Sequence, residues 1–185
     1  MAWTDSRIFT QAVLNPLTAS AWSTTEPTTY GANGLSADTI KVAVYNTSAT
    51  PDRDAVVGST GYGTGTWSGT EVTGTNWSAG GQTLGSKTYT AGTSVVAFDA
   101  ADVSVNTVTL AAFFGDLTYD DTITAGTVAK QGMCFHYYGG SQTVTAGNIT
   151  IIWDATGVFK FTLLLVLGAV MLIIWDATGV FRFTV

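Results

Sequence analysis

Basic residues are scarce in this sequence. Seven Lys and Arg stand against 13 Asp and Glu, which gives a formal net charge of −6, and charged residues make up only 11% of the 185 positions. Nucleic-acid binding depends on clustered cations that neutralise phosphates, and the sequence contains no such cluster. We therefore expect no nucleic-acid partner. A polar, weakly charged surface favours packing against copies of the same chain or a scaffold, with an ordinary secreted β-domain as the alternative.

Cysteine and histidine each occur once, as Cys134 and His136. One cysteine excludes an intrachain disulfide, so folding in a reducing cytoplasm is possible. A zinc site needs three or four ligands, and these two residues would leave carboxylates to supply the rest. Cys134, His136 and Tyr138 share one face of a predicted strand, where we expect the first two to lie ~7 Å apart, too far for nucleophile activation. The sequence therefore predicts no enzyme, no metal and no cofactor.

Three other patterns have the composition of ligand sites. Acidic residues gather at 52–54 and 116–121, where loop carboxylates can hold a hard cation, although solvated loops are the commoner explanation. The glycine-rich stretch 58–65 lacks the Lys-Ser/Thr of a phosphate loop, so we interpret it as a flexible loop. Aromatic residues that can stack on sugars if exposed are Tyr62, Trp67 and Trp77. In a β-protein, however, a Trp belongs more often to the core.

The sequence also lacks the patterns that direct export and membrane insertion. Residues 1–7 lack the basic region followed by an apolar stretch that a signal peptide needs, so we expect no export by that route. The uncharged part of the apolar C-terminus, 161–175, is 15 residues long and therefore shorter than the ~20 needed for a spanning helix. We expect no membrane insertion.

The chain is rich in β-branched and aromatic residues separated by turn signals. Residues 39–45 alternate in a way that is typical of a strand. Further strands are predicted at 82–89, 94–99, 107–114 and 132–138, with a weaker one at 122–129. Gly-Gly at 139–140 and Ala-Gly at 146–147 are predicted to close turns. The spacing predicts an all-β sandwich or barrel-like domain of short antiparallel strands.

The N-terminal segment follows a different pattern. Thr4 or Asp5 can cap a short helix that ends at Asn15-Pro16. The residues on the apolar face of this helix are Ile8, Phe9, Ala12 and Val13. Residues 18–38 are rich in Thr, Ser and Gly, so we interpret them as a loop or arm. The predicted organisation is a helix and arm at 1–38, a β-domain at 39–150, and a C-terminal hairpin segment at 151–185 that packs on the β-domain or on a neighbouring subunit.

The C-terminal segment contains a near-duplication. Residues 151–162, Ile-Ile-Trp-Asp-Ala-Thr-Gly-Val-Phe-Lys-Phe-Thr, recur at 173–184, and only Lys160 and Arg182 differ. Each copy predicts a hairpin around Asp-Ala-Thr-Gly, because Asp and Gly supply the turn chemistry. One hairpin site in a sheet cannot hold both copies. An intact mass of 19.3 kDa would establish that the protein carries both copies. If one copy were an artefact of the sequence, the measured mass would be lower by about the weight of one repeat.

The duplicated sequences are joined by an apolar run. Ten large aliphatic residues lie between 163 and 174, and leaving their side chains exposed would forgo on the order of 15–30 kcal/mol. The whole stability of a domain is only about 5–15 kcal/mol. This run is therefore expected in the core as an extra strand or helix, or against another chain. Lipid is the least favoured environment, because the run is short.

Six stretches scattered over the chain carry a family resemblance. They are 3–9, 38–46, 50–52, 71–81, 134–140 and 179–184, of which 71–81 is the most specific. Together they resemble the minor capsid, or head decoration, proteins of tailed phages that infect actinobacteria, including mycobacteriophages. The resemblance implies a non-enzymatic virion protein, made in the host cytoplasm, on the outer face of the head. The chain departs from the family pattern in its doubled ending, since that pattern stops once after Gly-Val-Phe-Arg-Phe-Thr.

The resemblance also implies partners, namely the phage major capsid protein and other copies of this chain, with a trimer favoured. The predicted function is reinforcement of the capsid lattice. Alternatives are a phage tail or fibre component, or a carbohydrate-binding β-module that uses Trp67 and Trp77 to bind a surface glycan. The candidate interface residues are Trp3, Ile8, Phe9, Trp67, Trp77, Trp153, Leu163, Leu165, Leu167 and Trp175.

Overall fold

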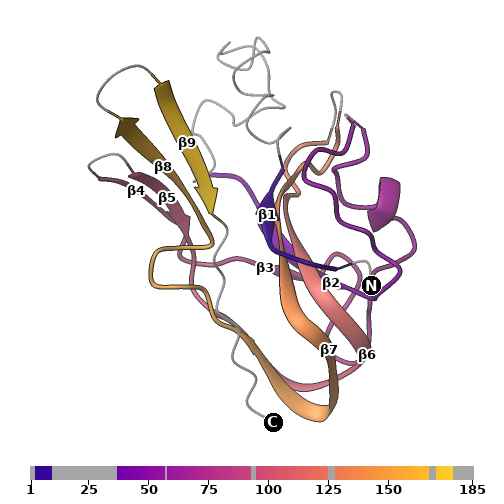
Figure 1. Ribbon diagram of the computed structural model, residues 1–185. Helices are drawn as coiled ribbons and strands as arrows, with labels where there is room; N and C mark the ends of the chain where they lie inside the picture. Colours follow the sequence, from indigo (N-terminus) through magenta and orange to yellow (C-terminus); the bar gives the residue numbers. More distant parts are fainter. Residues whose placement is uncertain are drawn as a thin grey trace.

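The computed structural model describes residues 3–9, 37–56, 58–92, 95–124, 128–166 and 170–176; for 91–92, 163–166 and 170–176 it describes the backbone. Within these ranges the chain forms two antiparallel sheets, and the helical content is a single 3-10 turn, η3 (Gly65–Trp67) (Figure 1). The predicted all-β, sandwich-like fold is confirmed. No helix in the described ranges is long and apolar enough to cross a membrane.

The two sheets differ in strand order. Sheet 1 runs β1-β7-β6-β2-β3, with β1 (Arg7–Ile8), β7 (Gly132–Ile151), β6 (Val103–Asp120), β2 (Ile40–Tyr45) and β3 (Gln82–Thr83). Sheet 2 runs β4-β5-β8-β9, with β4 (Thr88–Gly92), β5 (Val95–Asp99), β8 (Phe159–Val166) and β9 (Val170–Asp176). Figure 1 shows the long strands β6 and β7 paired at the centre of sheet 1, with sheet 2 to their left in this view.

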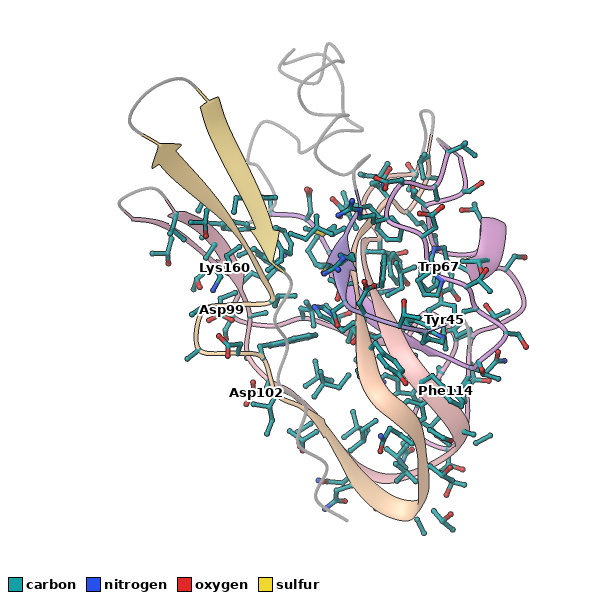
Figure 2. All side chains as sticks on the ribbon, viewed as in Figure 1. Tyr45, Trp67, Asp99, Asp102, Phe114 and Lys160 are labelled. Atoms are coloured by element: carbon teal, nitrogen blue, oxygen red, sulfur yellow. The ribbon has the colours of Figure 1, made fainter. Side chains whose placement is uncertain are left out.

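Alternation along β2 explains why sheet 1 is covered on both faces. Val42 and Val44 belong to the large hydrophobic cluster between the sheets, whereas Ala43 and Tyr45 belong to a second cluster on the opposite face. The second cluster is closed by Trp67, from the long segment that connects β2 to β3. Side chains fill both layers, and Figure 2 shows Tyr45 and Trp67 together on the far side of sheet 1.

The predicted N-terminal helix is wrong where it can be compared. Residues 7–8 form β1, which pairs with β7 through Arg7–Phe135 and Ile8–Cys134. Ile8 packs into the large cluster and Phe9 into the second one, on opposite faces of sheet 1. Consecutive residues that enter opposite cores require the two-residue period of a strand, which a helix cannot supply. The rest of the predicted helix, from residue 10 on, lies outside the described residues.

Several strand boundaries also differ from the prediction. Strand 39–45 is confirmed as β2 and strand 94–99 as β5. The predicted strand 82–89 is divided between β3 in sheet 1 and β4 in sheet 2, with Ser86 at a positive φ of 49° where the chain changes sheets. The described parts of 122–129 are turn and coil rather than strand.

The two turns predicted within 139–147 are also wrong, because β7 continues through them. Pairing with β6 shifts register between Phe113–Gln142 and Gly115–Tyr137, and again between Val108–Gly147 and Leu110–Val144. In both places β7 contains more residues than the β6 stretch it faces, so the extra residues form bulges. Gly139 has a φ of 76° and Ala146 a φ of 49°, a backbone geometry that suits a bulge.

The predicted turn at 154–157 is present, but it does not close a hairpin. The Asp154 Oδ1 atom accepts hydrogen bonds from the Thr156 backbone N–H at 2.8 Å and from its hydroxyl at 2.7 Å, and Gly157 N–H donates to the Asp154 carbonyl at 2.8 Å. The strands on either side pair with different partners, because β7 ends in sheet 1 and β8 begins in sheet 2. The first copy of the duplicated sequence is therefore a crossover between sheets.

The second copy begins inside β9. Ile173 pairs with Leu163, and Trp175 pairs with Phe161, so the start of the second copy runs antiparallel to the end of the first. In its described backbone the apolar run is thus strand rather than helix. Residues 177–185, which hold the second Asp-Ala-Thr-Gly turn in part, lie outside the described residues.

Candidate functional site

Most of the predicted interface residues are buried inside the chain. Trp3, Phe9 and Trp77 are at most 1% exposed. Ile8, Trp67 and Trp153 are also buried. These six positions are therefore corrected from interface to core. The physical reason is the size of the apolar groups: burying one aromatic of ~150–250 Å² favours folding by roughly 4–6 kcal/mol, and this chain has enough sheet surface to cover them.

The aromatic packing shows why the buried tryptophans cannot form a sugar platform. Trp3 and Trp67 meet edge to face with ring centroids 5.9 Å apart, and Tyr45 packs against Trp67 at 4.9 Å. The Trp3 indole N–H donates to the Asn46 carbonyl at 3.0 Å. With both ring faces inside the protein, Trp67 has no surface on which a sugar can stack, and Trp77 is 0% exposed.

A polar cluster lies buried between the sheets, built from β6 and β7. The His136 Nδ1 atom is 2.8 Å from Asp116 Oδ1, and the Tyr138 hydroxyl donates to Asp116 Oδ2 at 2.8 Å. The Cys134 Sγ atom is 3.8 Å from His136 Nε2. The shared face predicted for Cys134, His136 and Tyr138 is confirmed. The expected separation of ~7 Å was wrong for the reacting atoms, because side chains two residues apart on one strand face lean together.

The protonation of His136 decides what this cluster can do. Its Nε2 atom lies 3.2 Å from the Val158 carbonyl oxygen, which can only accept a hydrogen bond, so Nε2 carries a proton. Burial acts to lower the pKa of His136, but the Asp116 carboxylate and the Cys134 sulfur outweigh it and hold that pKa well above its usual value. The ring is an imidazolium that donates from both nitrogens, which leaves no lone pair to act as a base toward Cys134.

The cluster instead connects the crossover to sheet 1. Val158 and Trp153 both belong to the crossover; the Val158 carbonyl accepts from His136, and the Trp153 ring lies 5.5 Å from the imidazole. Asp116, His136 and Cys134 are all 0% exposed, so the charged pair is sealed from water. A charged group that is buried and paired holds its neighbours in place, since breaking such a pair is strongly destabilising.

Sequence reasoning missed Asp116 because residues 116–121 were interpreted as one loop. Asp116 and Asp120 lie in β6, and their side chains are buried; Asp121 follows in the turn. The alternation of Asp116, Thr118 and Asp120 with Leu117 and Tyr119 is the signal that could have placed them on one strand face. Among the described residues no group of three or more His, Cys, Asp or Glu is arranged to hold a metal ion.

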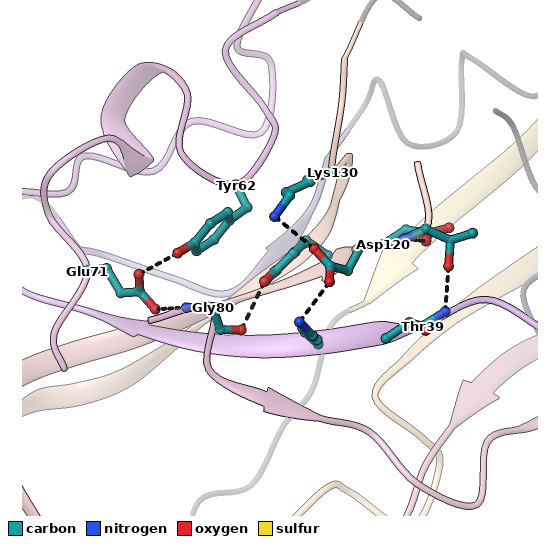
Figure 3. A network of polar contacts seen from close by, with 10 residues as sticks. Thr39, Tyr62, Glu71, Gly80, Asp120 and Lys130 are labelled. Atoms are coloured by element: carbon teal, nitrogen blue, oxygen red, sulfur yellow. Dashed lines mark hydrogen bonds and ion pairs between the residues drawn. The ribbon is translucent and has the colours of Figure 1, made fainter. Parts of the chain in front are cut away.

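A second polar network secures the glycine-rich segment to sheet 1 (Figure 3). The Glu71 carboxylate accepts from the Tyr62 hydroxyl at 2.7 Å and from the Gly80 N–H at 2.8 Å, and the Tyr119 hydroxyl donates to the Gly80 carbonyl at 2.9 Å. Tyr62 stacks on Tyr119 with centroids 4.7 Å apart. Burial and the bond to Glu71 raise the pKa of Tyr62 to about 12. The segment 58–65, which was predicted as a flexible loop, is held at Tyr62 by the hydrogen bond to Glu71 and by the stacking on Tyr119.

Comparison with known proteins gives no family for the chain. No family model, curated protein or solved structure matches it. The remaining predicted interface residues fall in or next to the β8–β9 hairpin. Leu163 and Leu165 are in β8 and Trp175 is in β9, whereas Leu167 lies outside the described residues.

The β8–β9 hairpin continues beyond the strand that supports it. β8 pairs with β5 from Phe98–Phe159 as far as Val95–Thr162, while its pairing with β9 continues to Val166–Val170. We call 163–166 and 170–173 the apolar ribbon. Every residue in it is Leu, Val, Met or Ile. Among the described residues, no third strand pairs with the ribbon on the β5 side.

The register assigns ribbon residues to two apolar faces. Leu163 and Leu165 share a face with Phe161, which is half-buried against the large hydrophobic cluster; its neighbour Val96 is 46% exposed. Leu164 and Leu172 are directly opposed on the other face. A two-stranded ribbon is marginal in water on its own, and this one has aliphatic residues on both faces. It is the candidate attachment segment of the chain.

Proposed function

We propose that this protein is a structural virion protein that sits on the outer face of a phage head and attaches through its apolar ribbon to the major capsid protein. The observation that carries the proposal is the ribbon, because an aliphatic two-stranded extension needs a partner surface to cover it. The family resemblance of six stretches supports the choice of a phage head as that surface. The sealed Asp116–His136–Cys134 cluster supports a structural rather than a catalytic role.

A repeated small contact is sufficient for this function. Burying two leucine side chains, such as Leu164 and Leu172, contributes roughly 3–6 kcal/mol. That is on the order of 10²- to 10⁴-fold in the dissociation constant of one site. On a lattice, neighbouring copies that also contact one another add avidity without any further increase in single-site affinity. Weakly charged surfaces suit such packing, because few charges need to be desolvated.

The test is co-sedimentation of the purified chain with undecorated heads. We expect many copies per head, and we expect Leu164→Ser with Leu172→Ser to lose binding. Val56→Ser is the matched control, since Val56 is 72% exposed and lies in the segment between β2 and η3. Circular dichroism should show the same β-content in all three proteins. The proposal fails if the unaltered chain does not co-sediment, or if the double variant binds as well as the control.

Copy number distinguishes the head from the tail. A head protein should be present in hundreds of copies per particle and a fibre protein in a few, so quantitative mass spectrometry of purified virions separates the two. The carbohydrate-binding alternative loses its two proposed contact residues, because Trp67 and Trp77 are buried.

A further inference from the structure

The first copy of the duplicated sequence fills a defined slot between the two sheets. We call it the crossover slot and define it by the groups that receive residues 151–162: Phe98 of β5, Ala101 and Asp102 before β6, and His136 of β7. Trp153, Val158 and Phe159 enter this slot and are at most 6% exposed. The slot is therefore a binding site that the chain fills with its own sequence.

Directional contacts fix the first copy in the slot. The Trp153 backbone N–H donates to Asp102 Oδ1 at 3.0 Å, and the Trp153 indole N–H donates to the Ala101 carbonyl at 3.2 Å. The Val158 carbonyl accepts from His136 Nε2 at 3.2 Å. The Phe159 ring lies 5.3 Å from the ring of Phe98. The receiving groups belong to other parts of the fold, so the slot recognises a short sequence rather than a whole domain.

Gly157 is the most restrictive position of the copy. Its φ is +110°, and a Cβ atom added there would lie 2.5 Å from the Phe98 carbonyl oxygen, which is backbone and cannot move aside cheaply. A non-glycine residue would be both strained and in collision at this point. The slot therefore requires glycine after Asp-Ala-Thr.

The second copy repeats every residue that makes these contacts. Trp175, Val180 and Phe181 correspond to Trp153, Val158 and Phe159, and Gly179 corresponds to Gly157. The single difference, Arg182 for Lys160, falls where the Lys160 ammonium donates to Thr156 of the same copy on the exposed side. None of the directional contacts that hold the first copy in the slot involves the residue at which the two copies differ. Each chain thus has one slot and two sequences that fit it.

We propose that the crossover slot is a self-association site whose second occupant is the C-terminal copy, 173–184, of another molecule of this chain. Exchange of one copy for an equivalent one preserves the contacts of the slot, and domain swapping of this kind is a low-cost route to oligomers. Within one molecule the start of the second copy is already paired with β8, through Phe161–Trp175 and Leu163–Ile173. To enter the slot of a neighbour, the second copy leaves this pairing with β8 of its own chain and takes the place of the neighbour's first copy.

Two glycine substitutions test this assignment on the full chain. Gly157→Ala excludes the first copy from the slot, and Gly179→Ala excludes the second. We expect Gly179→Ala to have the mass of one 19.3-kDa chain by light scattering after size exclusion. We expect Gly157→Ala to form dimers or larger multiples, because its slots can be filled only by second copies of neighbours. The double variant should lose the oligomers and melt at a lower temperature than either single variant.

Peptide addition keeps the test decisive if Gly157→Ala does not fold alone. A labelled peptide of residues 170–185 should then bind Gly157→Ala and restore its β-signal, and the same peptide with Ala at 179 should not. The proposal is overturned if Gly157→Ala is a folded monomer with unchanged melting, or if it neither oligomerises nor binds the peptide. These measurements contain no phage heads, so their outcome is independent of the proposed attachment to capsids.

Discussion

Replacing Asp116 by Asn removes the negative charge from the buried cluster while keeping the shape of the side chain. The imidazolium of His136 would then be buried without its counter-ion, and the Tyr138 hydroxyl would lose a carboxylate acceptor. Because all three side chains are between 0% and 8% exposed, water cannot compensate for the loss. The substitution therefore tests whether this cluster holds the crossover against sheet 1.

The expected cost is large for a single atom exchange. Breaking a buried ion pair by removing one partner destabilises a protein by about 3–5 kcal/mol. For a chain of this size, each kcal/mol lowers the melting temperature by roughly 2–4 °C, so Asp116→Asn should melt about 6–20 °C below the wild type. Replacing both partners by apolar residues of similar volume, as in Asp116→Leu with His136→Leu, should recover part of this loss.

The pH dependence provides the sharper readout. In the wild type, Asp116 raises the folded-state pKa of His136 above its unfolded value near 6.5, so this stabilisation is complete below pH ~6.5 and is lost as the pH rises through the folded pKa. In Asp116→Asn, burial, which is the largest influence on the pKa of His136, lowers that pKa against the remaining effect of the Cys134 sulfur, and stability should increase as the pH rises toward 6.5. The difference between the two proteins isolates this one histidine.

The assay is urea unfolding, followed by tryptophan fluorescence, at half-unit steps from pH 5 to pH 9. We expect the variant Asp116→Asn to be less stable than the wild type, and we expect this difference in the free energy of unfolding to become smaller as the pH rises. A pH-independent difference, or a difference below 1 kcal/mol, would refute the assignment of an imidazolium–carboxylate pair. Asp52→Asn, on an exposed loop, is the control for the loss of one negative charge.

Three further predictions concern positions away from His136. Burial and the neighbouring Asp38 raise the pKa of Asp120 to about 7, so wild-type stability should fall by up to about 4 kcal/mol as the pH rises from ~4 to ~7. In urea titrations, Asp120→Asn should abolish that fall. Gly81→Ala would place a Cβ atom 1.9 Å from the Val42 carbonyl oxygen at a φ of +68°, and calorimetry should show that the protein loses more than about 2 kcal/mol of stability. Gly85→Ala is the control: Gly85 has open space around it, so its substitution should be close to neutral. Trp77→Ala should cost about 3–5 kcal/mol of stability, and a glycan array should show no binding by the wild type; binding that Trp77→Ala abolishes without unfolding would contradict the core assignment.

Local pattern was sufficient for the strand content and for some turns. Alternation predicted β2 and the shared face of Cys134, His136 and Tyr138, because side chains on a strand repeat every two residues whatever the partner strand is. The Asp154 turn was predictable from its own four residues, since its hydrogen bonds all close within them. The excess of aliphatic residues after 162 likewise required burial or a partner without reference to any structure.

Tertiary structure decided what local pattern leaves open, namely which sheet each strand joins and what each side chain meets. Residues 151–162 have the pattern of a hairpin, yet β7 pairs with β6 and β8 with β5, and this choice depends on residues more than 40 positions away in both sheets. The same holds for Asp116, whose partner His136 comes from a different strand. The buried tryptophans became core for the same reason: exposure depends on which surfaces assemble around a residue, and only the assembled sheets determine that.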